Sequence, residues 1–374
     1  MNLSGRSYWA ALMIGLVISL VAARPLIINV VAGINDYLQI YSGARLAGTP
    51  YLYDAARNRQ VQVEAKEGYG VAAYYVRPPF YAGLLWPLGK LPYDQSFWVW
   101  QSMSVAALMG FILLWHIPNR RFVVLACCWS LPLVLVFVMG QDVTLLLLLL
   151  ALAFQFRTRN PIVAGLIMSL LAIKFNLFLL LPMLLVGQRR WRMTGGFLLG
   201  GAILVAASFG VAGSDWPRQM FVALSAKGSF PREDVMPDLR GLLQPFTGRI
   251  AVELALDLLV AGVTWMIVRY TDFEYGMAAV ITGSLLISHH AGPQDAAVLI
   301  PALMIVAART ITPWVNQLCL ILLTPLPYLF LICGHGLGAL AVLPLVAMLA
   351  AMSIETWRTV PGSIGRHAGL RDLT

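Results

Sequence analysis

Side chains capable of acid, base or anion-binding chemistry occur in only some of the short polar segments that separate the apolar runs of this sequence. Those segments carry Asp36, Asp142, Lys174, His289 and His290, and the alternate segments carry arginine instead. Arginine and lysine gather on the cytoplasmic side of membrane proteins. We therefore expect the chemically capable residues on the opposite face, which is the layout of a membrane enzyme that works outside.

Asp36 follows the first apolar helix directly, at the expected outer boundary of the membrane. A carboxylate partly removed from water is suited to accept a proton from a hydroxyl group, because desolvation disfavours its charged form. The same position is also common for an aspartate that caps the next helix. The sequence leaves both interpretations open.

Two cationic residues, Lys174 and Arg77, are candidates for the site. Lys174 lies between two apolar legs, residues 161–173 and 177–187, each of which covers roughly half a bilayer at about 1.5 Å per residue. We expect this lysine in a cavity beside an anionic partner, although a lysine can also extend to the membrane surface. Arg77, which precedes two prolines, could belong to the same site, or it could close an external loop by pairing with Asp54 or Glu64.

Further polar residues lie at the expected outer ends of helices. Gln141 and Asp142 are expected to form hydrogen bonds near the same pocket, and His289 and His290 form a pair that could act there. Asp295 could orient His290 or cap its own helix. No ligand-spacing motif supports a metal site, so neither a metal nor another cofactor is expected.

The apolar runs predict the architecture. Hydrophobic residues make up 59% of the chain and charged residues 11%, which excludes a soluble globular protein. We expect an all-α integral membrane protein, a single domain over residues 1–374 with about twelve spans. External loops are expected at 34–93, where short amphipathic helices should lie, and at 213–249. The net charge of +9 comes mostly from arginines near helix ends, so no nucleic acid partner is expected.

Several short motifs, in one order, resemble glycosyltransferase family 87. They are Asn35-Asp36-Tyr37 followed by Tyr41, Ala44-Arg45 and Tyr51-x-Tyr53-Asp54; Arg77-Pro78-Pro79-Phe80, where the family usually has tyrosine first; Gly140-Gln141; Ala172-Ile173-Lys174-Phe175 before Arg189-Arg190-Trp191; and Ser288-x-His290 before Gln294-Asp295. The likeness covers roughly residues 33–310.

The resemblance implies a C-type glycosyltransferase fold and an inverting transfer of a hexose, by family habit mannose, from a polyprenyl phosphate. Asp36 would be the general base, and Lys174, Arg77 and His290 would bind the donor phosphate, supported by Gln141, Asp142, His289 and Asp295. The acceptor would be a lipid or glycan at the periplasmic face of a bacterial inner membrane, among membrane lipids. The alternative is a secondary transporter or lipid flippase, for which intramembrane charges and broken helices serve equally well.

Overall fold

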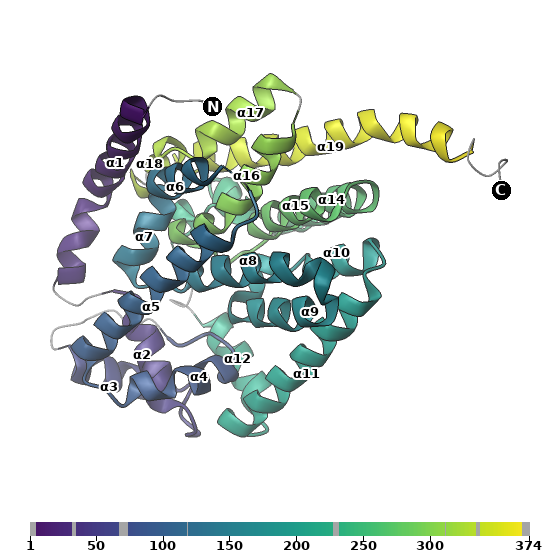
Figure 1. The fold of residues 1–374 in the computed structure, drawn as a ribbon. Helices are drawn as coiled ribbons and strands as arrows, with labels where there is room; N and C mark the ends of the chain where they lie inside the picture. Colours follow the sequence, from purple (N-terminus) through teal and green to yellow (C-terminus); the bar gives the residue numbers. More distant parts are fainter. Residues whose placement is uncertain are drawn as a thin grey trace. The chain divides into compact units, whose positions relative to one another are not determined.

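The computed structural model describes residues 5–31, 35–66, 74–117, 119–226, 232–310, 312–333 and 337–368, and in these ranges the regular secondary structure is helical throughout (Figure 1). The chain divides into two compact units. The first comprises Met1–Phe175 and Arg192–Arg232, and the second comprises Asn176–Trp191 and Glu233–Thr374. The all-helical prediction is confirmed, while the single domain over residues 1–374 stays a prediction.

Helices of the first unit are α1 (Gly5–Val31), α2 (Tyr37–Leu46), α3 (Ala55–Ala65), α4 (Pro79–Gly89), α5 (Tyr93–Leu114), α6 (Arg120–Trp129), α7 (Leu131–Met139), α8 (Val143–Arg159), α9 (Pro161–Ser169), the larger part of the 3-10 helix η1 (Leu170–Phe178), α11 (Trp191–Ala212) and α12 (Trp216–Ser225). Those of the second unit are α10 (Leu181–Gly187), η2 (Glu233–Val235), α13 (Leu239–Leu243), α14 (Ile250–Tyr270), α15 (Phe273–Leu286), η3 (Pro293–Val298), α16 (Leu299–Arg309), α17 (Pro313–Leu322), α18 (Leu326–Cys333) and α19 (Ala339–Ala368).

Six helical segments in the described part of the chain are long and apolar enough to cross a membrane. They are α1, α5, α9 continued through η1, α11, α14 and α19. Two bent pairs, α6 with α7 at 63° and α17 with α18 at 44°, raise the number to eight if each pair is one span. Twelve spans are not confirmed, because α10, α15 and α16 have only 7, 14 and 11 residues where about 20 are needed.

Three short helices, α2, α3 and α4, lie within the expected first external loop, of which residue 34 and residues 67–73 fall outside the described ranges. α3 is not amphipathic in the expected sense, because the side chains that it buries are the polar Asn58 and Gln62. Ser42 on α2 donates to Asn58 Oδ1 at 2.8 Å and accepts from Gln62 Nε2 at 3.3 Å. Hydrogen bonds therefore dock α3, since a buried polar group needs a partner.

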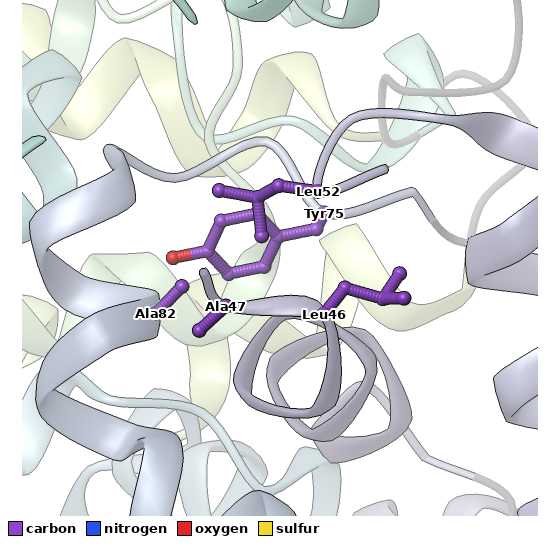
Figure 2. Close-up of a cluster of buried hydrophobic side chains, with 5 residues drawn as sticks. All are labelled: Leu46, Ala47, Leu52, Tyr75 and Ala82. Atoms are coloured by element: carbon purple, nitrogen blue, oxygen red, sulfur yellow. The ribbon is translucent and has the colours of Figure 1, made fainter. Parts of the chain in front are cut away.

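An apolar cluster fixes the backbone that leads to Arg77. Leu46, Ala47, Leu52, Tyr75 and Ala82 pack together (Figure 2). The Tyr75 hydroxyl donates to the Pro78 carbonyl at 3.1 Å. A Cβ at Gly43 of α2 would overlap the Tyr75 ring, so this glycine allows the tyrosine to pack against the helix. The segment on both sides of Arg77 is thereby held in place.

α9 and α11 approach closely because glycines face each other between them. A Cβ at Gly196 would overlap the Ile162 carbonyl, and one at Gly165 would overlap the Met193 carbonyl. The neighbouring Gly195 and Gly201, by contrast, face open space. Small residues commonly allow such close packing between membrane helices.

We expect Gly196→Ala to lower the apparent melting temperature of the detergent-solubilised protein, because its methyl group would push α9 away from α11. Gly195→Ala is the matched control: it should be neutral or slightly stabilising, since replacing a helical glycine with alanine favours the helix by roughly 0.5–1 kcal/mol. Equal melting temperatures for the two variants would contradict the packing described for this helix pair.

Candidate active site

A carboxylate with no solvent exposure, Asp142, lies at the centre of a polar network in the first unit. The Arg77 guanidinium donates to both of its oxygens, from Nε at 2.7 Å and from Nη2 at 3.3 Å. Lys174 Nζ lies 3.3 Å from Asp142 Oδ1. Arg77 is only 5% exposed and Lys174 only 8%, so all three charges are removed from water together.

The two cations keep the Asp142 carboxylate ionised. Burial alone raises the pKa of Asp142, but the charges of Arg77 and Lys174 and the hydrogen bonds from Arg77 outweigh it and lower the pKa to about 2. For Arg77, burial lowers the pKa and the neighbouring Asp142 raises it, with a net increase above the usual value. Because the pKa of Asp142 is lowered on folding, its contribution to stability is present at neutral pH and is lost only as the pH falls toward 2.

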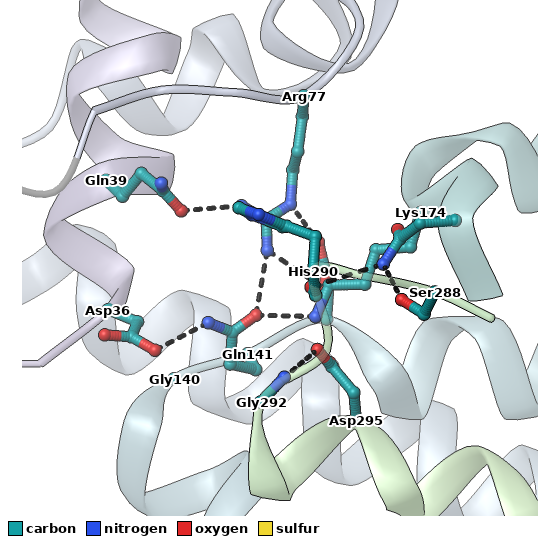
Figure 3. A network of polar contacts seen from close by, with 12 residues as sticks. Asp36, Gln39, Arg77, Gly140, Gln141, Lys174, Ser288, His290, Gly292 and Asp295 are labelled. Carbon is teal, nitrogen blue, oxygen red and sulfur yellow. Dashed lines mark hydrogen bonds and ion pairs between the residues drawn. The ribbon is translucent and has the colours of Figure 1, made fainter. Parts of the chain in front are cut away.

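Gln141 connects this charged cluster to Asp36, the expected base. Its Oε1 accepts hydrogen bonds from Arg77 Nη2 at 2.8 Å and from Lys174 Nζ at 2.9 Å. Its Nε2 donates to Asp36 Oδ2 at 2.7 Å, as Figure 3 shows. Asp36 itself is half-buried. The structure therefore brings together five of the residues expected from the sequence: Asp36, Arg77, Gln141, Asp142 and Lys174.

Gln39 belongs to the same network and was missed in the sequence. Its Oε1 accepts from Arg77 Nη1 at 2.8 Å, and its Nε2 donates to the Tyr74 carbonyl. The available signal was spacing, because Gln39 follows Asp36 by three residues and residues three apart share one face of a helix. This spacing makes Gln39 a candidate for the same site as Asp36.

The backbone presents Gln141 and Lys174 through irregular geometry. Gly140 ends α7 in the left-handed region at φ 67°, and a Cβ there would lie 2.8 Å from Tyr37 Cβ, so a glycine is required on both counts. Trp100 Nε1 donates to the Gly140 carbonyl at 2.9 Å. Lys174 departs from helical geometry inside η1, at φ −127° and ψ 68°, which agrees with the expected break between two short apolar legs.

The structure also decides several alternatives that the sequence left open. The Asp36 side chain makes no capping hydrogen bond to α2, so the capping interpretation is wrong. Arg77 pairs with Asp142; Asp54 instead accepts from the Arg57 amide, and Glu64 accepts from Gln60. Lys174 is buried beside an anionic partner and does not extend to a surface.

His289 and His290 lie in a turn of the second unit, and hydrogen bonds from Asn176 hold this turn in place. Asn176 Nδ2 donates to Ser288 Oγ at 2.8 Å and to the His290 carbonyl at 3.3 Å. His289 adopts a positive φ of 54°. Ser288, from the Ser288-x-His290 motif, therefore helps to fix the turn by accepting the hydrogen bond of Asn176.

Two carboxylates on α14, Glu253 and Asp257, lie beside the His289 ring. Its Nε2 lies 2.8 Å from Asp257 Oδ2 and 3.4 Å from Glu253 Oε1. Arg240 donates to Glu253 Oε1 at 2.9 Å. Sequence reasoning missed this cluster, although two carboxylates four residues apart in an apolar helix signal a shared polar face. His289 thus has a local role in anchoring its turn.

Asp295 caps the start of η3, since its Oδ2 accepts the Gly292 amide at 2.9 Å (Figure 3). The capping alternative for this residue is confirmed. Within the described residues, no group of three or more histidine, cysteine, aspartate or glutamate side chains is arranged to hold a metal ion. Independence from metals stays a prediction.

The model of glycosyltransferase family 87 matches residues 75–289, more than half of the chain. Arg77, Gln141, Asp142, Lys174 and His289 fall inside the matched segment, whereas Asp36 precedes it and His290 follows its last residue. No curated protein and no solved structure matches the chain.

We expect Asp142→Asn to destabilise the protein strongly. Asparagine keeps the size of the side chain but leaves two buried cations beside a neutral amide, and breaking a buried ion pair in this way costs about 3–5 kcal/mol. Thermal unfolding in detergent measures the effect.

Asp94→Asn is the matched control for Asp142→Asn. Asp94 pairs with Lys66 at 2.8 Å in the same unit, but its side chain is 71% exposed, and exposed pairs contribute about 0–1 kcal/mol. Similar losses for the two variants would show that the buried pair adds no special stability.

Proposed function

Because the chain belongs to glycosyltransferase family 87 and is a membrane glycosyltransferase, we propose that it transfers a hexose from a polyprenyl-phosphate donor to a lipid or glycan acceptor, with inversion. Asp36 is the general base in this proposal. It removes the proton from the acceptor hydroxyl as the oxygen attacks the anomeric carbon. The bond from that carbon to the phosphate oxygen breaks, and polyprenyl phosphate leaves with the electron pair.

The observation that carries the proposal is the Gln141 amide, which bonds Asp36 at one end and Arg77 and Lys174 at the other. A carboxylate and two cations thus share one residue. An inverting transfer from a phosphate needs these two kinds of group near each other: a base for the acceptor and positive charge for the leaving group. Family membership also favours a transferase over the transporter or flippase alternative.

The cluster of Arg77, Lys174 and Asp142 has a net charge that suits a donor with one phosphodiester. Arg77 and Lys174 carry two positive charges and Asp142 carries one negative charge, so these three residues sum to +1. A sugar linked through phosphate to a polyprenol carries one negative charge, and the departing phosphate gains a second as the bond breaks. Buried cations stabilise that developing charge more than solvated ones do. His290 is proposed as a further phosphate ligand.

The membrane setting supports a lipid-linked donor. The chain has six to eight candidate spans, and α1, α5 and α11 expose apolar side chains such as Val21, Leu113 and Leu198. A polyprenyl chain is compatible with such an apolar environment. The alternation of arginine-bearing segments favours the periplasmic face of a bacterial inner membrane for the reaction, and mannose is proposed from family habit alone.

Asp36→Asn tests the base. With purified protein, radiolabelled polyprenyl-phosphate sugars and total membrane lipid, we expect its transfer rate to fall about 10²–10⁴-fold, the usual contribution of general base catalysis. Asp94→Asn, an exposed aspartate of the same unit, should keep the wild-type rate. Undiminished transfer by Asp36→Asn would remove Asp36 from the reaction.

Lys174→Met tests the phosphate role. The variant keeps the Arg77–Asp142 pair, so we expect it to fold and to show a donor KM about tenfold or more above wild type, since hydrogen bonds to charged groups contribute about 1.5–3 kcal/mol. Lys90→Met, at an exposed lysine that lies over the Trp86 ring, serves as the control. Donor kinetics that match wild type in Lys174→Met would exclude the lysine from phosphate binding.

A further inference from the structure

The two ends of the Gln141 amide face groups of opposite charge. Oε1 lies 2.8 Å from Arg77 Nη2 and 2.9 Å from Lys174 Nζ, and Nε2 lies 2.7 Å from Asp36 Oδ2. Only 5% of the residue is exposed to solvent. Each side-chain end therefore has its partners inside the protein.

These partners permit only one orientation of the amide. A guanidinium and an ammonium are donors without acceptor capacity, and an ionised carboxylate is an acceptor without a donor. Rotating the amide by 180° would set its NH₂ group against two cations and its carbonyl oxygen against the Asp36 carboxylate. The charges of Arg77 and Lys174 thus oblige Gln141 to offer a hydrogen-bond donor to Asp36.

The main chain of Gln141 is fixed as firmly as its side chain. Its amide nitrogen donates to the Val136 carbonyl at 2.9 Å, closing the turn at the end of α7. The left-handed Gly140 packs against Tyr37, the residue that follows Asp36. Gln141 and the start of α2 therefore keep a constant spacing, which a stable hydrogen bond between their side chains needs.

We infer that Gln141 is a positioning residue for the reaction, which holds the Asp36 carboxylate in place by donating to Oδ2 and is itself oriented by Arg77 and Lys174. The inference rests on the proposed role of Asp36 as base. A hydrogen bond to Oδ2 restrains rotation of the Asp36 carboxylate and so holds the group in a defined orientation. It also favours the ionised form that a base requires.

Gln141→Glu separates the two functions of the amide. A glutamate has nearly the same size and still accepts from Arg77 and Lys174, but it no longer donates and it places a second carboxylate against Asp36. We expect kcat to fall at least about tenfold, as the loss of a charge-assisted hydrogen bond implies. The acid limb of the pH profile of kcat/KM should move up by about one pH unit or more. Donor KM should rise as well, because the added carboxylate cancels the net positive charge of Arg77, Lys174 and Asp142. Asp142 has a pKa of about 2, so its titration does not produce an upward shift of the acid limb.

Gln60→Glu is the matched control, because Gln60 also accepts from an arginine, Arg57, and donates to a carboxylate, Glu64, but it is exposed and lies outside this network. It should leave the position of the acid limb unchanged. Gln141→Met, which neither accepts nor donates, provides the same readouts if Gln141→Glu does not fold, and it should also shift the acid limb upward.

The results distinguish this inference from the proposed function. If Asp36→Asn is inactive while Gln141→Glu keeps the wild-type kcat and pH profile, the positioning role is wrong and the base assignment stands. If Gln141→Glu changes donor KM alone, Gln141 belongs to the phosphate site and the positioning role is again wrong. If Asp36→Asn retains full activity, the proposed base is wrong, and the positioning inference fails with it.

Discussion

A carboxylate without contact to solvent stays ionised only when cations approach it closely, and the first unit is built around one such group. Asp142 is fully buried, and Arg77 and Lys174 satisfy it from two separate parts of the chain. Neither cation would be stable at its position without this partner. The ion pairs therefore fix where the segment before α4 and the break in η1 must lie.

Close packing makes that constraint possible. Tyr75, in the segment before Arg77, packs against Gly43 of α2. Gly140, in the turn before Gln141, packs against Tyr37. Both contacts depend on the absence of a Cβ. The glycines thus bring α2, the segment around Arg77 and the turn between α7 and α8 near enough for side chains to bond directly, which gives Gln141 access to both Asp36 and the cations.

The second unit also contains carboxylates in an apolar helix, and other side chains pair with them. Glu253 and Asp257 lie in an otherwise apolar helix, where Arg240 pairs with Glu253 and His289 Nε2 lies 2.8 Å from Asp257 Oδ2. Asn176 secures the adjacent turn through Ser288. Both units therefore stabilise irregular turns beside apolar helices by means of charge pairs, since backbone groups and charges removed from water require partners.

The sequence by itself determined the helical membrane class, the break at Lys174 and the residues Asp36, Arg77, Gln141, Asp142 and Lys174 as candidates, because apolar run length, proline and charge are local properties of the chain. It did not determine the partners. Arg77 bonds Asp142, 65 residues away, and not the nearer Asp54 or Glu64, while Gln39 and the cluster around His289 went unnoticed. Tertiary packing decided these pairings, because the cost of burying a charge depends on which distant side chains come within bonding distance.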